Sequence, residues 1–178
     1  MNTNKIVITG GPGTGKSTLI NYLIGQGHIC LEEISRQITK EAQKNGIDQL
    51  FLTNPLLFSK LLLEGRQKQY IDSEIYKGKT VFFDRGIPDV LAYMNYIGDQ
   101  YTEVFTKACN DYRYNKVFIL KPWKAIYKSD NERYESFEQA QQIHDHLVST
   151  YQDFNYNLVD VPFGSIESRA QFILNSIT

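Results

Sequence analysis

The feature that most constrains how this chain can fold is the run GGPGTGKST at residues 10–18. It matches the pattern G-x-x-x-x-G-K-[ST], in which glycines let successive backbone N–H groups turn toward an anion. The lysine of such a loop reaches the β- and γ-phosphates of a nucleotide, and the hydroxyl that follows it can coordinate Mg²⁺. We therefore expect a phosphate-binding loop, or P-loop, with contacts from Gly11, Pro12, Gly13, Thr14, Gly15, Lys16, Ser17 and Thr18.

The segments on either side of this loop support the interpretation. Residues 5–9, KIVIT, form a β-branched run typical of a strand, and they lead directly into the loop. Residues 17–24 place aliphatic side chains on one helical face, and Gly25 stands where such a helix would stop. The alternative is a chance glycine-rich turn, which requires neither a strand before it nor a helix after it.

Length and charge narrow the class of protein. The chain has 178 residues and a formal net charge of −1, which favours one domain over residues 1–178 and indicates neither a nucleic acid nor a membrane as partner. No apolar run approaches the ~20 residues that span a membrane. We expect Cys30 and Cys109 to be reduced, and the first strand begins too early for a signal peptide, so the chain is expected to be cytoplasmic. The oligomeric state stays open.

Alternating strands and helices predict the fold class. Further apolar strands are expected at residues 29–31, 80–83, 117–120 and 158–161. Helical patterns occupy residues 33–44, 55–76, 88–96, 101–112, 136–156 and the stretch from 165 onward. Buried strands separated by helices predict an α/β fold, in which a parallel sheet is covered by helices on both faces. Ligands of such sheets collect at the carboxyl ends of the strands.

Charged residues follow the third of these strands. Asp84 closes the strand and is a candidate to hold Mg²⁺ through water or to accept the proton of an attacking hydroxyl. The alternative is that Asp84 caps the helix that follows. Arg85 is suited to bind a phosphate or a substrate hydroxyl, although an ion pair with Glu33 or Asp89 is the alternative for it.

A second charged group follows the second strand. Glu33 and Arg36 have the i, i+3 spacing of neighbours on a helix. Glu33 can orient or deprotonate a substrate hydroxyl there, whereas the alternative is a surface ion pair without a chemical role. Glu32 competes with Glu33 for the same position. Tyr93, on the helix after Asp84, can line a pocket or belong to the core.

The segment after the fourth strand, residues 121–135, is rich in Lys, Arg and Tyr. We interpret it as a lid whose Arg133 neutralises the γ-phosphate during transfer, with Lys124 and Lys128 as weaker candidates. A solvated loop is the alternative. His144 and His146 lie on different helix faces, so their spacing does not predict a metal pair.

The motifs in combination resemble the small P-loop AAA-domain ATPase and kinase family that includes the ribosylnicotinamide-kinase domain of bifunctional NAD-biosynthesis regulators, and more widely the nucleoside and nucleotide kinases. The residues that carry the resemblance are Ile8 to Ser17, Glu33-x-x-Arg36, Phe83-Asp84-Arg85-Gly86-x-Pro88-Asp89 with Ala92-Tyr93, Asp130-x-x-Arg133, Tyr151, and Val161-Pro162 with Ser165-x-x-x-Arg169. Where these proteins carry a glycine after the lid aspartate, this chain has Asn131, which also tolerates left-handed turns.

The resemblance implies a three-layer P-loop NTPase fold with a parallel five-stranded core, and it implies ATP and Mg²⁺ as cofactors. The predicted activity is transfer of the γ-phosphate to a small-molecule acceptor that is nucleoside- or nucleotide-like. A P-loop ATPase or a nucleotide-sensing protein without an acceptor is the alternative. The predicted catalytic residues are Lys16, Asp84, Arg133 and Glu33, the metal-binding residues are Ser17 and Asp84, and the acceptor-binding residues are Glu33, Arg36, Arg85, Asp89 and Tyr93. A GTPase is disfavoured because Asn115-Lys116 continues as Val117-Phe118 rather than as an Asn-Lys-x-Asp motif.

Overall fold

The computed structural model describes residues 2–127 and 135–177. Its centre is a five-stranded sheet with the order β2-β3-β1-β4-β5, and every neighbouring pair of strands is parallel. The strands are β1 Asn4–Gly10, β2 Ile29–Leu31, β3 Thr80–Asp84, β4 Lys116–Leu120 and β5 Leu158–Val161. The predicted parallel five-stranded α/β fold is therefore confirmed.

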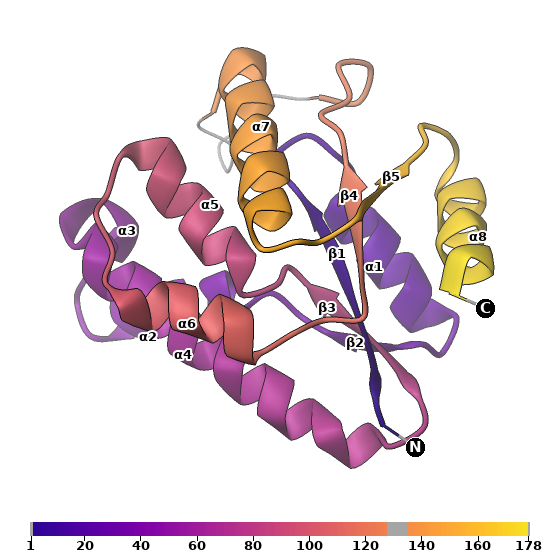
Figure 1. Ribbon diagram of the computed structural model, residues 1–178. Helices are drawn as coiled ribbons and strands as arrows, with labels where there is room; N and C mark the ends of the chain where they lie inside the picture. The colour runs from indigo at the N-terminus through magenta and orange to yellow at the C-terminus, as the bar shows by residue number, and fades with distance from the viewer. Residues whose placement is uncertain (1, 128–134, 178) are drawn as a thin grey trace.

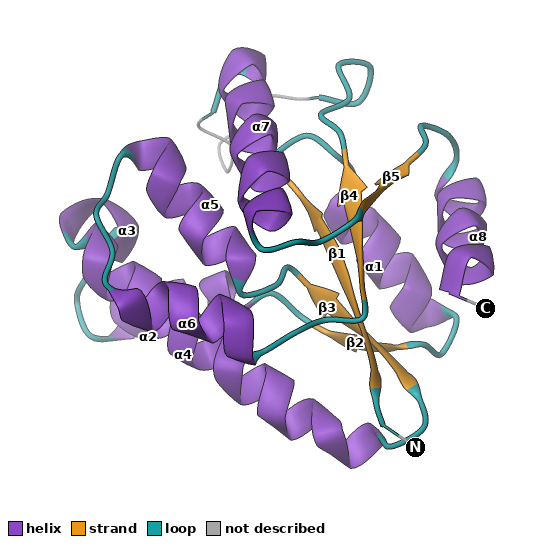
Figure 2. Ribbon diagram, in the orientation of Figure 1, coloured by secondary structure: helices purple, strands orange, loops and turns teal. Residues whose placement is uncertain are grey.

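Helices cover both faces of this sheet and complete three layers (Figures 1 and 2). They are α1 Lys16–Gly25, α2 Ile34–Lys44, α3 Leu50–Thr53, α4 Pro55–Asp72, α5 Pro88–Ile97, α6 Glu103–Asp111, α7 Phe137–Asp153 and α8 Ile166–Ile177, with a 3₁₀ turn, η1, at Ser73–Tyr76. Of the helices in the described ranges, none is long and apolar enough to cross a membrane.

Side chains alternate between the two faces along each strand, and this alternation produces two hydrophobic cores, one on each face of the sheet. Successive side chains of a strand point to opposite faces, so Ile6 and Ile8 of β1 join one core while Val7 joins the other. The first core is closed by α1 and α8, and the second by α4, α5, α6 and α7. The three central strands, β3, β1 and β4, are buried on both faces, which explains why they read as nearly continuous apolar runs.

Some boundaries differ from the prediction. The helix expected over residues 55–76 ends at Asp72 and continues only as the turn η1. The short helix α3 was not predicted, because four residues are too few to show a helical period. It precedes Asn54, whose side chain accepts a 3.1 Å hydrogen bond from the N–H of Leu57 and so begins α4.

Candidate active site

The P-loop lies where β1 passes into α1, as predicted. Gly13 and Gly15 have φ angles of 72° and 75°, in the left-handed region that favours glycine. The hydroxyl of Thr14 donates a 3.0 Å hydrogen bond to the carbonyl of Gly11 and closes the loop. Ser17 and Thr18 are exposed in the first turn of α1, where backbone N–H groups and the helix dipole favour an anion.

The beginning of the predicted lid packs on this loop. The backbone N–H of Trp123 donates a 3.2 Å hydrogen bond to the carbonyl of Gly13. A Cβ atom on Gly13 would lie 2.2 Å from the ring of Tyr127, so a residue with a side chain does not fit there. Arg133 and the rest of residues 128–134 lie outside the described residues, so the arginine lid stays a prediction.

Arg169 of α8 supports the loop from the other side. Its side chain is 3% exposed, and its Nη2 donates a 2.9 Å hydrogen bond to the carbonyl of Thr14. Its guanidinium also lies 6.0 Å from the centre of the Trp123 ring, which stacks on Phe163 with ring centres 5.0 Å apart. Sequence reasoning quoted Arg169 only within a family pattern and gave it no role, because only the fold brings α8 beside the P-loop.

Lys16, Asp84 and Glu33 meet beside the P-loop. The Lys16 ammonium forms an ion pair with Oδ1 of Asp84 and lies 3.7 Å from Oε2 of Glu33. Burial and the nearby positive charge of Arg85 lower the pKa of Lys16, although both carboxylates act in the opposite direction. The structure thus brings together three of the residues predicted to be catalytic.

The two alternatives for the carboxylates are decided by geometry. Glu33 directs its carboxylate into the site, whereas the side chain of Glu32 is exposed. Asp84 does not cap α5, because Ile87 occupies the N-cap position of that helix. Arg36 is exposed and forms no ion pair with Glu33, so the expected i, i+3 pair is not formed, and acceptor binding by Arg36 stays a prediction.

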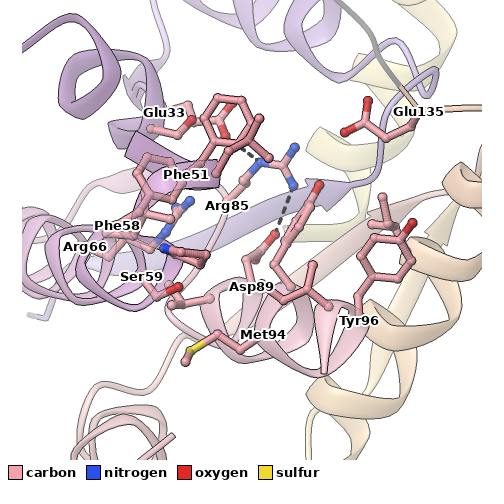
Figure 3. A pocket seen from close by; sticks show the side chains of 18 of the residues that line it. Glu33, Phe51, Phe58, Ser59, Arg66, Arg85, Asp89, Met94, Tyr96 and Glu135 are labelled. Atoms are coloured by element: carbon pink, nitrogen blue, oxygen red, sulfur yellow. Dashed lines mark hydrogen bonds and ion pairs between the residues drawn. The ribbon is translucent and has the colours of Figure 1, made fainter. Parts of the chain in front are cut away.

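Arg85 is held between two carboxylates (Figure 3). Its Nε lies 2.8 Å from Oε1 of Glu33 and its Nη1 lies 3.3 Å from Oδ1 of Asp89. Burial by itself would raise the pKa of Glu33, but Arg85 and Lys16 outweigh burial and hold that pKa well below its usual range. Arg85 has a φ angle of 73°, an uncommon value for a residue with a side chain.

Asp89 is the buried anchor of this arrangement. It accepts hydrogen bonds of 2.5 Å from the Thr9 hydroxyl, 2.6 Å from the Tyr151 hydroxyl and 2.9 Å from the backbone N–H of Gly86. With Arg85, these donors occupy both carboxylate oxygens. Asp89 therefore positions Arg85. Sequence reasoning quoted Thr9 and Tyr151 only within a family pattern and gave neither of them a part in the site.

A cavity of about 650 Å³ opens beside the charged cluster. Its walls come mainly from α3, α4 and α5, and Figure 3 shows Arg85 among the labelled side chains that line it. Tyr93 lines the cavity and packs its ring 5.4 Å from the Arg85 guanidinium, as one of the two sequence alternatives expected. Most of the lining is apolar or aromatic: Phe51, Leu52, Pro55, Phe58, Leu62, Val90, Met94, Tyr96, Ile97 and Ile143.

Arg66 is a lining residue that sequence reasoning missed. Its side chain is 3% exposed, and its Nη1 donates a 3.2 Å hydrogen bond to the backbone carbonyl of Asp84. In the sequence it lies in the run EGRQKQ, which is indistinguishable from the solvated face of a helix. Only the packing of α4 shows that Arg66 is buried while Lys68, in the same run, is exposed.

Solved structures with the same fold include several kinases. Deoxyadenosine kinase from M. mycoides, with bound dATP, matches 97% of this chain over 98% of its own length, at 14% identity and a TM-score of 0.67. Thymidylate kinase from Candida albicans matches 99% of this chain over 91% of its own, at 18% identity and a TM-score of 0.71. NadR protein in complex with NR matches 98% of this chain over 48% of its own, at 16% identity and a TM-score of 0.72.

Sequence comparison identifies the family. No curated protein matches the chain significantly. The model of a family described as AAA domain, in contrast, matches residues 5–169, which include the P-loop, the Asp84 strand end and Arg169. Because this match covers most of the sequence and agrees with the P-loop geometry, the chain belongs to the AAA domain family.

Proposed function

We propose that this protein is an ATP- and Mg²⁺-dependent kinase that transfers the γ-phosphate to a small-molecule acceptor of the nucleoside or nucleotide type. The observation that carries the proposal is the position of the cavity: largely apolar walls enclose a space that ends at Glu33 and Arg85, beside Lys16 and Asp84. A plain ATPase needs room for water only. The kinase names of the structural neighbours support the same choice.

The P-loop would bind the nucleotide. Its N–H groups and the first turn of α1 would hold the phosphates, and Lys16 would leave its ion pair with Asp84 to contact the β- and γ-phosphates. Ser17 and Asp84 provide the hard oxygen donors that Mg²⁺ prefers. The described residues contain no group of three or more His, Cys, Asp or Glu side chains able to hold a metal, so phosphate oxygens would complete the coordination. Bound there, Mg²⁺ would neutralise phosphate charge.

The reaction would proceed from the cavity side. A hydroxyl or phosphate oxygen of the acceptor forms a bond to the γ-phosphorus while the bond from that phosphorus to the β–γ bridging oxygen breaks, and ADP leaves with the bridging oxygen. The proton of an attacking hydroxyl passes to Asp84. Glu33 is better suited to orient that hydroxyl, because a carboxylate with a lowered pKa is a weak base and a permanent hydrogen-bond acceptor.

Arg133 would complete the site as part of the lid formed by residues 121–135. Its charge would act on the γ-phosphate as the phosphoryl group moves. The contacts of Trp123 and Tyr127 with the P-loop support this placement, because they bring the beginning of the segment to the phosphate site. The need for ATP and the two free cysteines fit the cytoplasm as the place of action.

The test is an acceptor screen with the purified protein, ATP and Mg²⁺. The panel contains nucleosides, including nicotinamide riboside, and nucleoside monophosphates, and both ADP and the phosphorylated product are measured. We expect slow ADP release without acceptor, strong stimulation by one class of acceptor, and activity reduced by roughly 10²-fold or more in Lys16→Ala. ADP release that no acceptor stimulates, with inorganic phosphate as the sole product, would support the ATPase alternative instead.

A further inference from the structure

Arg66 is a buried cation without a full set of partners. Its Nη1 donates to the Asp84 carbonyl, but its Nε is buried and has no hydrogen-bond partner among the described residues. Within the same part of the chain, no carboxylate forms an ion pair with it. A buried guanidinium with so few partners destabilises the folded protein, because its protein contacts do not compensate for the desolvation of its charge and of its Nε–H group.

The position of Arg66 on α4 directs it to the cavity. Pro55, Phe58, Ser59, Leu62 and Arg66 all line that space. Their spacing follows one face of a helix, so α4 presents a continuous stripe that begins with apolar side chains and ends with the guanidinium. Figure 3 shows Arg66 beside Phe58 and Ser59, on the side of the cavity near Glu33. The cavity is the open space beside the guanidinium, so a bound molecule can supply hydrogen-bond partners that the protein does not.

The charges of the cavity restrict what that molecule can be. Among the described residues that line it, Arg66 and Arg85 are cationic, whereas Glu33, Asp89 and Glu135 are anionic. Arg85 is already neutralised by its pairs with Glu33 and Asp89. The lining therefore carries three carboxylates against two guanidinium groups, which disfavours a dianionic phosphate group in the cavity. An uncharged oxygen would accept a hydrogen bond from Arg66 without adding charge.

We infer that Arg66 binds the phosphate acceptor through an uncharged oxygen, and that the acceptor is a neutral, hydroxyl-bearing ring compound such as a nucleoside rather than a nucleotide. The inference rests on the proposed kinase function and assigns a binding role that only the tertiary structure reveals. The oxygen belongs either to the sugar or to a carbonyl of the base. Both accept a hydrogen bond from the Arg66 guanidinium, and matched acceptors distinguish them.

The first experiment compares acceptors with the wild-type protein and with Arg66→Met. The probes are inosine, purine riboside, which lacks the ring carbonyl, 2′-deoxyinosine and inosine monophosphate, with uridine, 2′-deoxyuridine and uridine monophosphate in parallel. We expect nucleosides to be preferred over their monophosphates. Arg66→Met is expected to raise KM for the nucleoside roughly tenfold or more, the size expected for a lost hydrogen bond to a charged group, and to leave KM for ATP within about twofold.

The pattern of preferences identifies the oxygen and can overturn the inference. If the preference for inosine over purine riboside disappears in Arg66→Met, the oxygen is the ring carbonyl; if the preference over 2′-deoxyinosine disappears, it is the sugar oxygen. A monophosphate that is preferred by the wild type overturns the charge argument while the kinase function stands. An unchanged KM for the nucleoside in Arg66→Met overturns the binding role. An equal rise in KM for ATP also overturns it, because it indicates that the substitution displaces Asp84.

A second measurement needs no substrate and separates this inference from the kinase proposal. An apolar side chain of similar length removes the desolvated charge, so Arg66→Met is expected to melt at the wild-type temperature or above it. Lys60→Met, an exposed position on the same helix, is the matched control. If the kinase screen finds no acceptor, the kinase proposal fails. A clear fall in the melting temperature of Arg66→Met would show that Arg66 stabilises the fold through its hydrogen bond to the Asp84 carbonyl. That result would overturn the inference independently of the kinase screen.

Discussion

The hydroxyl of Tyr151 on α7 donates a 2.6 Å hydrogen bond to Oδ2 of Asp89 on α5, although the two residues are 62 positions apart in the sequence. Both side chains are buried, and burial together with the Asp89 charge raises the pKa of Tyr151 well above its usual value. The hydrogen bond therefore persists throughout the physiological pH range. Through Asp89 it connects the helix after the predicted lid to Arg85 in the candidate site.

Tyr151→Phe tests this connection. Removal of a hydrogen bond to a buried charge is expected to lower the free energy of unfolding by roughly 1.5 kcal/mol or more. Because Asp89 then holds Arg85 less firmly, kcat is expected to fall while KM for ATP changes little. Urea unfolding and steady-state kinetics measure the two effects. Tyr101→Phe is the control, and equal stability of both variants would contradict the role of the Tyr151 hydroxyl.

Lys16→Ala is expected to reduce phosphoryl transfer by roughly 10²-fold or more and to leave the protein folded. Its ammonium contacts the carboxylates of Asp84 and Glu33 rather than the apolar core. Turnover with ATP and Mg²⁺ and a circular-dichroism spectrum are the measurements, with Lys60→Ala as control. Wild-type turnover in Lys16→Ala would exclude the P-loop as the phosphate site.

Asp84→Asn is expected to lower kcat by on the order of 10²-fold and to change ATP affinity far less, because an amide neither accepts a proton nor binds Mg²⁺ as a carboxylate does. Nucleotide binding by calorimetry and kcat by product formation separate the two quantities. A variant with normal turnover and a lower melting temperature would show that the Lys16–Asp84 ion pair is structural only.

Arg133→Ala is expected to slow phosphoryl transfer by roughly 10³-fold and to leave the affinity for ADP intact, because ADP lacks the phosphoryl group that the arginine would contact. Single-turnover kinetics and ADP titration test the two parts, and Lys121→Ala, at an exposed position whose side chain pairs with Asp160, is a control within the same segment. Hydrogen exchange of residues 121–135 is expected to slow when a non-hydrolysable ATP analogue binds. Equal exchange with and without the analogue, together with an unchanged rate, would refute the lid.

The stability of the protein is expected to depend on pH through Glu33. Its pKa is lower in the folded protein than in the unfolded chain, so its contribution is complete above the unfolded value of about 4.3 and is lost as the pH falls further toward the folded value. The difference in unfolding free energy between the wild type and Glu33→Gln should therefore be largest near neutral pH and should shrink below about pH 4. Urea unfolding over this range measures it, and a constant difference would argue against the Arg85 and Lys16 pairs as its source.

The sequence by itself determined the P-loop, the five strands and the position of Asp84 at the end of β3. These features can be recognised from neighbouring residues alone. Glycines at fixed spacing indicate a loop with backbone angles that other residues avoid, and short apolar runs indicate buried strands. Local patterns also located the long helices, but their ends were less certain, because a cap such as Asn54 decides them.

The tertiary structure decided which polar side chains belong to the site. The sequence offered Glu32 and Glu33, and two neighbouring acids were equivalent until the fold placed Glu33 beside Lys16 and Arg85. It also favoured Arg36, which is exposed, and it gave no role to Arg66, which is buried. A charged residue on a helix carries no local sign of burial. Whether its charge meets water or a cavity depends on how distant elements pack, and that packing is set by the whole chain.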